Sequence, residues 1–238
     1  MDNAGNRPDG AGVFITFEGG EGAGKTTHIR FLAKALEGLG YSVLMLREPG
    51  GTELGEALRA LVLDPAYGPV SPRCEMLIYE AARAQLVDEV IKPALAAGKI
   101  VLCDRFTDST EAYQGFGRGI DREQVRTANA FAADGLVPHA TLLLRCEGAA
   151  EGLVRATHHG SADRLEQAGL DFHQRVELGF GQMCRESDGR IRVIDTSGPK
   201  SLTAAQVFSA LVDVVPALAD SALFDEDYFS VLDVKAHG

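Results

Sequence analysis

The sequence predicts a three-layer α/β fold in which a five-stranded parallel sheet lies between helices on both faces. Three observations carry this prediction. Short apolar runs recur along the chain, helical patterns separate them, and the first run leads through a glycine-rich loop into a helix. Strands and helices that alternate in this order are typical of a doubly wound parallel sheet.

The five apolar runs have the length of strands, and most are unbroken rather than alternating. Strands buried on both faces show this pattern, because helices cover both sides of a parallel sheet. We therefore expect strands at residues 13–17, 42–46, 100–103, 141–144 and 191–194.

The segments between these runs carry amphipathic helical patterns. In residues 26–39, Ile29 and Leu32 fall on one face and Arg30 and Lys34 on another. The same kind of pattern predicts further helices at residues 53–63, 72–97, 122–133, 162–184 and 201–218.

The 238 residues are expected to form one domain, because no interior segment has the composition of a linker. We expect a disordered lead-in at residues 1–12, a globular domain at residues 13–218 and a C-terminal tail at residues 219–238. The tail mixes acidic and apolar residues without a clear period, and the sequence assigns it no function.

The composition restricts the classes of partner. A net charge of −11 argues against binding to nucleic acid, and no run of about 20 apolar residues predicts a membrane span. The four cysteines form no CxxC pair, so we expect buried thiols rather than a zinc or redox site. The N-terminus lacks the pattern of a secretion signal. We therefore expect a cytoplasmic protein with small-molecule partners.

The glycine-rich loop at residues 19–26 matches GxxxxGK[ST] and lies between the first strand and the first helix. Its backbone N–H groups and the helix N-terminus suit a phosphate chain, Lys25 can reach the outer phosphates, and Thr26 can bind Mg²⁺. A tight turn alone would require neither Lys25 nor Thr26. The residues expected to bind the phosphates are Gly19, Gly20, Glu21, Gly22, Ala23, Gly24, Lys25, Thr26 and Thr27.

The loop alone does not select a reaction, because several enzyme classes share it. Three further segments restrict the choice: Arg-Glu-Pro-Gly-Gly-Thr at residues 47–52, Asp-Arg-Phe at 104–106, and Ala-Tyr-Gln-Gly at 112–115, continuing through Gly-Arg-Gly at 117–119. Together with residues 17–27 they make the chain resemble bacterial thymidylate kinases over residues 13–194.

The resemblance implies a P-loop kinase fold with a mobile lid and transfer of a phosphoryl group from ATP to dTMP in dTTP biosynthesis. It also implies Mg²⁺ as cofactor and a homodimer. Asp104, which follows the third strand, would hold Mg²⁺ directly or through water, although it could instead cap a helix. Arg105 would grip the acceptor phosphate, a task that suits a guanidinium fork.

The resemblance also implies an acceptor site for dTMP. Its expected members are Glu21, Glu48, Arg59, Tyr79, Arg83, Arg105, Ser109, Thr110, Tyr113 and Gln114.

Each aromatic or charged member of this site has an implied role and a plainer alternative. Tyr79 would stack on thymine, or only pack in the core. Arg83 would reach a base carbonyl, or form a surface salt bridge. Arg59 would be a second arginine for the acceptor phosphate, or part of a solvated helix face. Glu48 would order that phosphate or its Mg²⁺.

The remaining members would contact the sugar and the base edge. Glu21 would accept a hydrogen bond from the sugar 3′-hydroxyl, or be a surface acid. Tyr113 would crowd the ribose 2′ position and so favour deoxyribose. Thr110 or Gln114 would read the thymine edge.

The lid is where the sequence departs from the family. It is expected at about residues 148–164, where related sequences carry several arginines, but here His159 occupies the position of the usual last one. Arg155 and Arg164 remain as candidates to stabilise the transferring phosphoryl group, since the phosphate loop has no arginine. In addition, Arg145 on the fourth strand replaces the usual Asp.

These departures leave two alternatives beside an active thymidylate kinase. One is a nucleotide-binding regulatory protein, or a weakly active paralogue, with an altered lid. The other is a kinase for a modified pyrimidine monophosphate.

Overall fold

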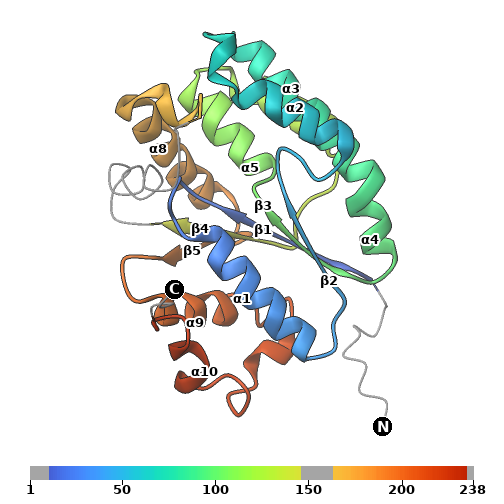
Figure 1. The fold of residues 1–238 in the computed structure, drawn as a ribbon, viewed down its shortest axis with the longest axis vertical. Helices are drawn as coiled ribbons and strands as arrows, with labels where there is room; N and C mark the ends of the chain where they lie inside the picture. Colours follow the sequence, from blue (N-terminus) through green and yellow to red (C-terminus); the bar gives the residue numbers. More distant parts are fainter. Residues whose placement is uncertain (1–10, 146–162, 235–238) are drawn as a thin grey trace.

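The computed structural model describes residues 11–145 and 163–234 (Figure 1). Five parallel strands form its central sheet in the order β2-β3-β1-β4-β5. The strands are β1 (Val13–Glu18), β2 (Val43–Arg47), β3 (Ile100–Asp104), β4 (Ala140–Arg145) and β5 (Ile191–Asp195). The predicted fold class and all five predicted strands are confirmed, and each strand ends one residue later than predicted, on a charged residue.

The register of the sheet places three loops side by side. In the pairing of β1 with β3, Phe17 lies opposite Asp104, and in the pairing of β2 with β3, Arg47 lies opposite the same residue. Ligands of open α/β sheets bind outside the carboxyl ends of the strands. The loops after β1, β2 and β3 therefore leave the sheet together at the edge where a site is expected.

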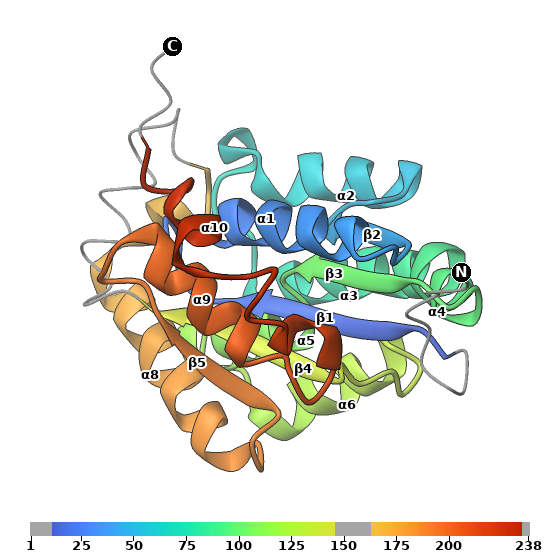
Figure 2. The same ribbon diagram turned by 90° about the horizontal axis from the view of Figure 1, so that it is seen from below.

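Helices cover both faces of this sheet (Figures 1 and 2). Side chains of β1 alternate between the faces: Ile15 and Phe17 pack with α1 and α9, whereas Phe14 packs with α3 and α4. The helices are α1 (Lys25–Gly38), α2 (Glu53–Leu63), α3 (Pro72–Leu86), α4 (Lys92–Ala96), α5 (Thr107–Thr110), α6 (Arg122–Ala132), α8 (Leu170–Glu186), α9 (Lys200–Ser209) and α10 (Glu226–Ser230).

Three predicted helices differ from the observed ones. The helix expected at residues 72–97 is divided by a π-helical turn, Val87–Ile91, just before Pro93, which has no N–H to donate. The helix expected at 162–184 begins only at Leu170, because Gly169 has a φ of 90°. The helix expected at 201–218 ends at Ser209, and a short 3-10 turn, Pro216–Ala219, follows it.

The sequence analysis missed the helical segment that follows β3. Residues after β3 form α5 and then a π-helical stretch, Glu111–Gly117. This segment carries Ser109, Thr110, Tyr113 and Gln114, and it packs against α8. It is therefore the support for one wall of the predicted acceptor site.

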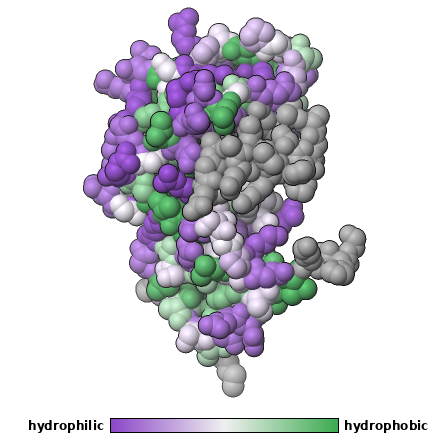
Figure 3. All heavy atoms as spheres, turned by 90° about the vertical axis from the view of Figure 1, so that its left-hand side faces the viewer, coloured by the Kyte–Doolittle hydropathy of each residue, from purple (hydrophilic) through white to green (hydrophobic). Residues whose placement is uncertain are grey.

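The cysteines and the surface complete the description. Cys103 is buried, but Cys74 is exposed, so the expectation of buried thiols is wrong for Cys74, which lies on the outer side of α3. On the face seen in Figure 3, hydrophilic and hydrophobic residues are interspersed. Within residues 11–145 and 163–234, no helix is both long enough and apolar enough to cross a membrane.

Candidate active site

Two adjoining pockets lie at the carboxyl ends of β1, β2 and β3. The loop pocket, of about 910 Å³, is lined by the phosphate loop together with residues such as His28, Asp104 and Lys200. The inner pocket, of about 170 Å³, lies beside it. Both pockets are lined by Glu21, Glu48, Arg59 and Arg105. A molecule in one pocket would therefore meet a molecule in the other across these four side chains.

The phosphate loop has a backbone that requires glycine where it leaves β1. Gly19 has a φ of 129°, and a Cβ atom there would lie 2.2 Å from the carbonyl oxygen of Leu144. Lys25 is 7% exposed, and its Nζ donates hydrogen bonds to the carbonyl oxygens of Gly19 (3.2 Å) and Gly20 (2.9 Å). Burial, and next the nearby Arg105, lower the pKa of Lys25. An anion in the loop pocket would compensate both of these unfavourable effects.

Asp104 and Thr26 meet at the floor of the loop pocket. The Thr26 hydroxyl donates to Oδ2 of Asp104 at 3.3 Å, while Oδ1 of Asp104 is buried without a hydrogen-bond partner. Hydroxyl and carboxylate oxygens are the ligands that Mg²⁺ takes, usually only one or two from the protein. The donor set therefore fits Mg²⁺. Among the residues that the structure describes, no group of three or more His, Cys, Asp or Glu is arranged so that it could hold a metal ion.

Arg105 connects the two pockets through its backbone and its side chain. Its φ of 71° lies in the left-handed region, which is uncommon for a residue with a side chain. Its Nη1 donates to the Gly19 carbonyl oxygen and to the Ser109 hydroxyl, both at 3.1 Å, and its Nη2 forms an ion pair with Glu21. Its guanidinium carbon lies 5.1 Å from the ring centre of Tyr113. The unusual backbone turns the guanidinium toward the phosphate loop.

Glu21 is a negatively charged acceptor at the mouth of the inner pocket. Burial alone would raise the pKa of this carboxyl group, but Arg105 and then Lys25 outweigh burial and lower the pKa to about 2. The Tyr113 hydroxyl also approaches Oε1 of Glu21, at 3.4 Å. Glu21 is therefore a carboxylate at neutral pH, and it is not the exposed surface acid of the plainer alternative.

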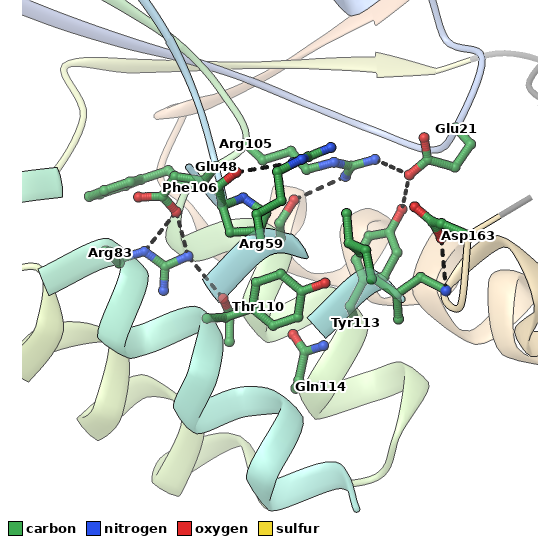
Figure 4. Close-up of a pocket in the computed structure, with 15 residues that line it drawn as sticks. Glu21, Glu48, Arg59, Arg83, Arg105, Phe106, Thr110, Tyr113, Gln114 and Asp163 are labelled. Carbon is green, nitrogen blue, oxygen red and sulfur yellow. Dashed lines mark hydrogen bonds and ion pairs between the residues drawn. The ribbon is translucent and has the colours of Figure 1, made fainter. Parts of the chain in front are cut away.

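Arg83 and Glu48 form a buried ion pair on the opposite side of the inner pocket (Figure 4). Arg83 is 2% exposed, so it is not a surface arginine. Its five N–H groups make five hydrogen bonds, two to Glu48 and one each to Glu80, Asn129 and Thr110. Burial raises the pKa of Glu48 to about 7 although Arg83 opposes the shift.

The other predicted acceptor residues also line the inner pocket. The Tyr79 hydroxyl is buried without a hydrogen-bond partner, and Arg59 donates from Nη1 to the Pro49 carbonyl oxygen at 3.0 Å. Gln114 donates from Nε2 to Glu75 at 2.8 Å, which orients its amide. The ten predicted acceptor residues are thus brought together in one cavity. The cavity walls also include Phe106, Asp163 and Leu165, which the sequence analysis did not assign.

Glu18 is the main residue that the sequence analysis passed over. It is fully buried and accepts hydrogen bonds from the backbone N–H groups of Phe106 (2.8 Å) and Ser109 (3.3 Å) and from the Ser109 hydroxyl (2.5 Å). Glu18 therefore fixes the first turn of α5. This is the helix-capping role that the sequence analysis had left open for Asp104. Burial, and next Asp108, raise the pKa of Glu18 to about 8. An acid directly before the phosphate loop, at the end of an apolar strand, was the available signal.

Arg164, a predicted catalytic arginine, lies elsewhere. Its Nη1 pairs with the fully buried Glu75 at 2.5 Å, and its Nε donates to the Val62 carbonyl oxygen at 2.8 Å. It lines neither pocket. Arg164 thus occupies an anchoring position between α2 and α3, where it compensates the buried carboxylate of Glu75, and its catalytic role stays a prediction.

The other unusual basic residues of the lid region are only partly described. Arg145 makes a 3.6 Å ion pair with Glu177 on α8 and is half exposed. Arg155, His158 and His159 lie outside the described residues.

Comparison with known proteins decides the family. The sequence model of the thymidylate kinase family matches residues 17–207. The chain belongs to the thymidylate kinase family. The match includes every predicted site residue, so the two pockets described above are those of a thymidylate kinase fold.

Individual thymidylate kinases support the same assignment. The one from Pelotomaculum thermopropionicum is 47% identical over 208 residues, covering 87% of this chain and 95% of that protein. The one from Gloeobacter violaceus is 48% identical over 204 residues, covering 85% and 95%. A crystal structure of thymidylate kinase from Ehrlichia chaffeensis has a TM-score of 0.68 at 31% identity, covering 84% of this chain and 99% of that one.

The E18Q variant tests whether the buried carboxyl group of Glu18, next to the phosphate loop, is protonated at neutral pH. The unfolded carboxyl group titrates near 4.5 and the folded one near 8. Between these pH values the unfolded state binds fewer protons, so wild-type stability falls as the pH rises. The free energy of unfolding of the wild type minus that of E18Q should fall from pH 5 to pH 8, by at most about 1.4 kcal/mol per pH unit.

Urea denaturation at both pH values measures this difference. E37Q, at an exposed position of α1, is the control for pH effects that all variants share. A difference between wild type and E18Q that stays constant or grows with pH would contradict the assignment.

Proposed function

We propose that this chain transfers the terminal phosphoryl group of ATP to dTMP, giving ADP and dTDP, and so serves dTTP biosynthesis. One observation carries the proposal: the loop pocket and the inner pocket share Glu21, Glu48, Arg59 and Arg105. Phosphoryl transfer between two nucleotides depends on holding their phosphates against each other with positive charge around them. Two arginines at the junction supply that charge in a chain whose net charge is −11.

In this proposal the loop pocket holds ATP. Backbone N–H groups of residues 19–27 and the N-terminus of α1 cradle the phosphates. Lys25 leaves the two loop carbonyl groups that it now contacts and reaches the outer phosphates. Thr26 and Asp104 hold Mg²⁺, directly or through water, and a bound Mg²⁺ would neutralise charge on the phosphate oxygens.

The inner pocket holds dTMP, with its phosphate at Arg105 and Arg59. Tyr79 stacks on the base, and Arg83 approaches a base carbonyl. Because all five N–H groups of Arg83 already donate, the carbonyl would replace Thr110, the neutral hydroxyl acceptor among them. Thr110 and the oriented amide of Gln114 are then available to read the base edge.

The sugar lies between Glu21 and Tyr113. The Glu21 carboxylate accepts the 3′-hydroxyl hydrogen bond, for which its low pKa makes it suitable. Tyr113 is 4% exposed and packed against Arg105, so it has little room to yield to a 2′-hydroxyl. These contacts favour deoxyribose.

The arrangement favours an active kinase over a regulatory paralogue. Lys25, Asp104 and Arg105 are all present and close to one another, and a protein that only bound nucleotide would not need Arg105 in a strained conformation. With Arg164 anchored on Glu75, Arg155 is the remaining lid arginine proposed to stabilise the transferring group.

We also propose a cytoplasmic homodimer. The helices α2, α3 and α6 carry exposed apolar side chains, including Leu77 at 60% and Phe131 at 88% exposure. A second copy related by a two-fold axis would cover such side chains.

The proposed reaction is tested with purified protein, ATP and Mg²⁺. We expect dTMP to be converted to dTDP faster than dUMP, dCMP or UMP is phosphorylated, with kcat/KM as the measure. K25A should lose at least about 10³-fold in kcat, because it removes charge from the transferring phosphates. Wild-type turnover no greater than that of K25A would refute the proposal, and a preference for another monophosphate would redirect it.

The R164A variant separates anchoring from catalysis. Loss of one partner from the buried Glu75 should lower the free energy of unfolding by about 1–3 kcal/mol, while kcat at saturating substrates stays within about threefold of wild type. R145A, which removes a half-exposed arginine with a longer ion pair, is the control and should change stability by less than about 0.5 kcal/mol. Unchanged stability together with a large fall in kcat would restore Arg164 as a catalytic residue.

A further inference from the structure

The C-terminal segment, residues 220–234, lies beyond the residues that the family model matches. The family match ends at residue 207, yet this segment folds back and forms α10 against α9 and α1 (Figure 2). The sequence showed no period here, because the residues that pack come from a turn and one short helix.

Aromatic side chains attach the segment to both helices. Phe229 is 8% exposed, and its ring centre lies 5.1 Å from that of Phe208 on α9. Tyr228 lies 5.2 Å from Phe31 on α1, and Phe224 lies 5.0 Å from Phe208. Aromatic pairs in this range add to the free energy of apolar burial. The segment thus holds α1 and α9 together along the side away from the sheet.

The end of the segment completes the N-terminus of α9. The capping position of α9 is Pro199, whose side chain accepts no hydrogen bond. Oδ1 of Asp233 accepts one instead, from the backbone N–H of Ser201 at 3.1 Å. Hydrogen bonds from Ser201 lower the pKa of Asp233. A cap that is normally supplied by the adjoining residue is supplied here from the C-terminal end of the chain.

Both helices begin at the loop pocket. Lys200 and Thr203 on α9 line it, as does His28 on α1. The Thr203 hydroxyl donates to the Asp195 carbonyl oxygen at 3.2 Å, which ties α9 to the end of β5. Buried polar atoms without partners, Nδ1 of His28 and Oγ1 of Thr196, belong to the same wall. Displacement of α9 relative to α1 would therefore change the shape of this wall.

We propose that residues 220–234 are a positioning element of the loop pocket, which set its affinity for nucleotide by clamping α9 against α1 and by capping α9 through Asp233. The inference rests on the proposed function in one respect, that the nucleotide in this pocket is ATP. It assigns the C-terminal segment to the donor side of the reaction and leaves the inner pocket outside its reach.

Calorimetric titration of the full chain with a non-hydrolysable ATP analogue and Mg²⁺ tests the proposal. D233A should weaken binding about three- to tenfold, the size expected for loss of a helix cap. D233N should bind within about twofold of wild type, because asparagine and aspartate cap equally well. V231A, which alters a 60% exposed side chain of the same segment, is the matched control. F229A should also weaken binding, with a lower melting temperature.

Titration of the same variants with dTMP tests whether the effect is confined to the loop pocket. We expect D233A to bind dTMP as the wild type does. Equal affinity of wild type, D233A and F229A for the ATP analogue would overturn the proposal, as would equal losses for ATP analogue and dTMP. A loss in D233N as large as that in D233A would overturn the capping role. Failure of the wild type itself to bind the ATP analogue would overturn both this inference and the proposed function.

Discussion

Arg105 is held with a φ of 71°, and from this position its guanidinium contacts the Gly19 carbonyl oxygen, Glu21 and Ser109. The contact joins the end of β3 to the phosphate loop after β1, and the register of the sheet brings these two strand ends together. The loop pocket and the inner pocket both depend on it, since Arg105 and Glu21 line both. Glu48 and Arg59 line both pockets as well, but Arg105 and Glu21 are the pair that joins the phosphate loop to the end of β3.

Hydrogen bonds in the residues that follow Arg105 hold its unfavourable backbone conformation in place. The fully buried Glu18 accepts hydrogen bonds from the backbone N–H groups of Phe106 and Ser109. The Ser109 hydroxyl donates to Glu18 and accepts from Arg105. A sparsely populated backbone conformation persists only when its surroundings over-determine it, as these hydrogen bonds do. The positive charge of Arg83 is likewise compensated by neighbouring side chains, because Arg83 forms ion pairs with Glu48 and Glu80. The cations of the site are therefore few, and each is held by acceptors of the chain: carboxyl groups for Arg83 and Arg105, and backbone carbonyl oxygens for Lys25 and Arg59.

The sequence was sufficient to predict what depends on local pattern. The five strands, the phosphate loop and the pair Asp104 and Arg105 follow from apolar runs and motifs. The resemblance to one family predicted the acceptor residues, which line one cavity in the structure. Hydrophobic period does not encode hydrogen-bond register, so the π-helical turn at Val87–Ile91 was missed. The position of Arg164 depends on Glu75, which is distant in sequence, and the packing of Phe229 depends on α1 and α9. Such contacts exist only after folding.

The role of Arg105 at the junction is tested most directly by the affinity for dTMP, measured calorimetrically with and without a non-hydrolysable ATP analogue, in wild type and R105A. In the proposed arrangement Arg105 would screen one phosphate chain from the other, so R105A should lose dTMP affinity in both conditions but about tenfold more when the analogue is bound. An equal loss in the two conditions would show that Arg105 serves the acceptor alone and would contradict a shared site.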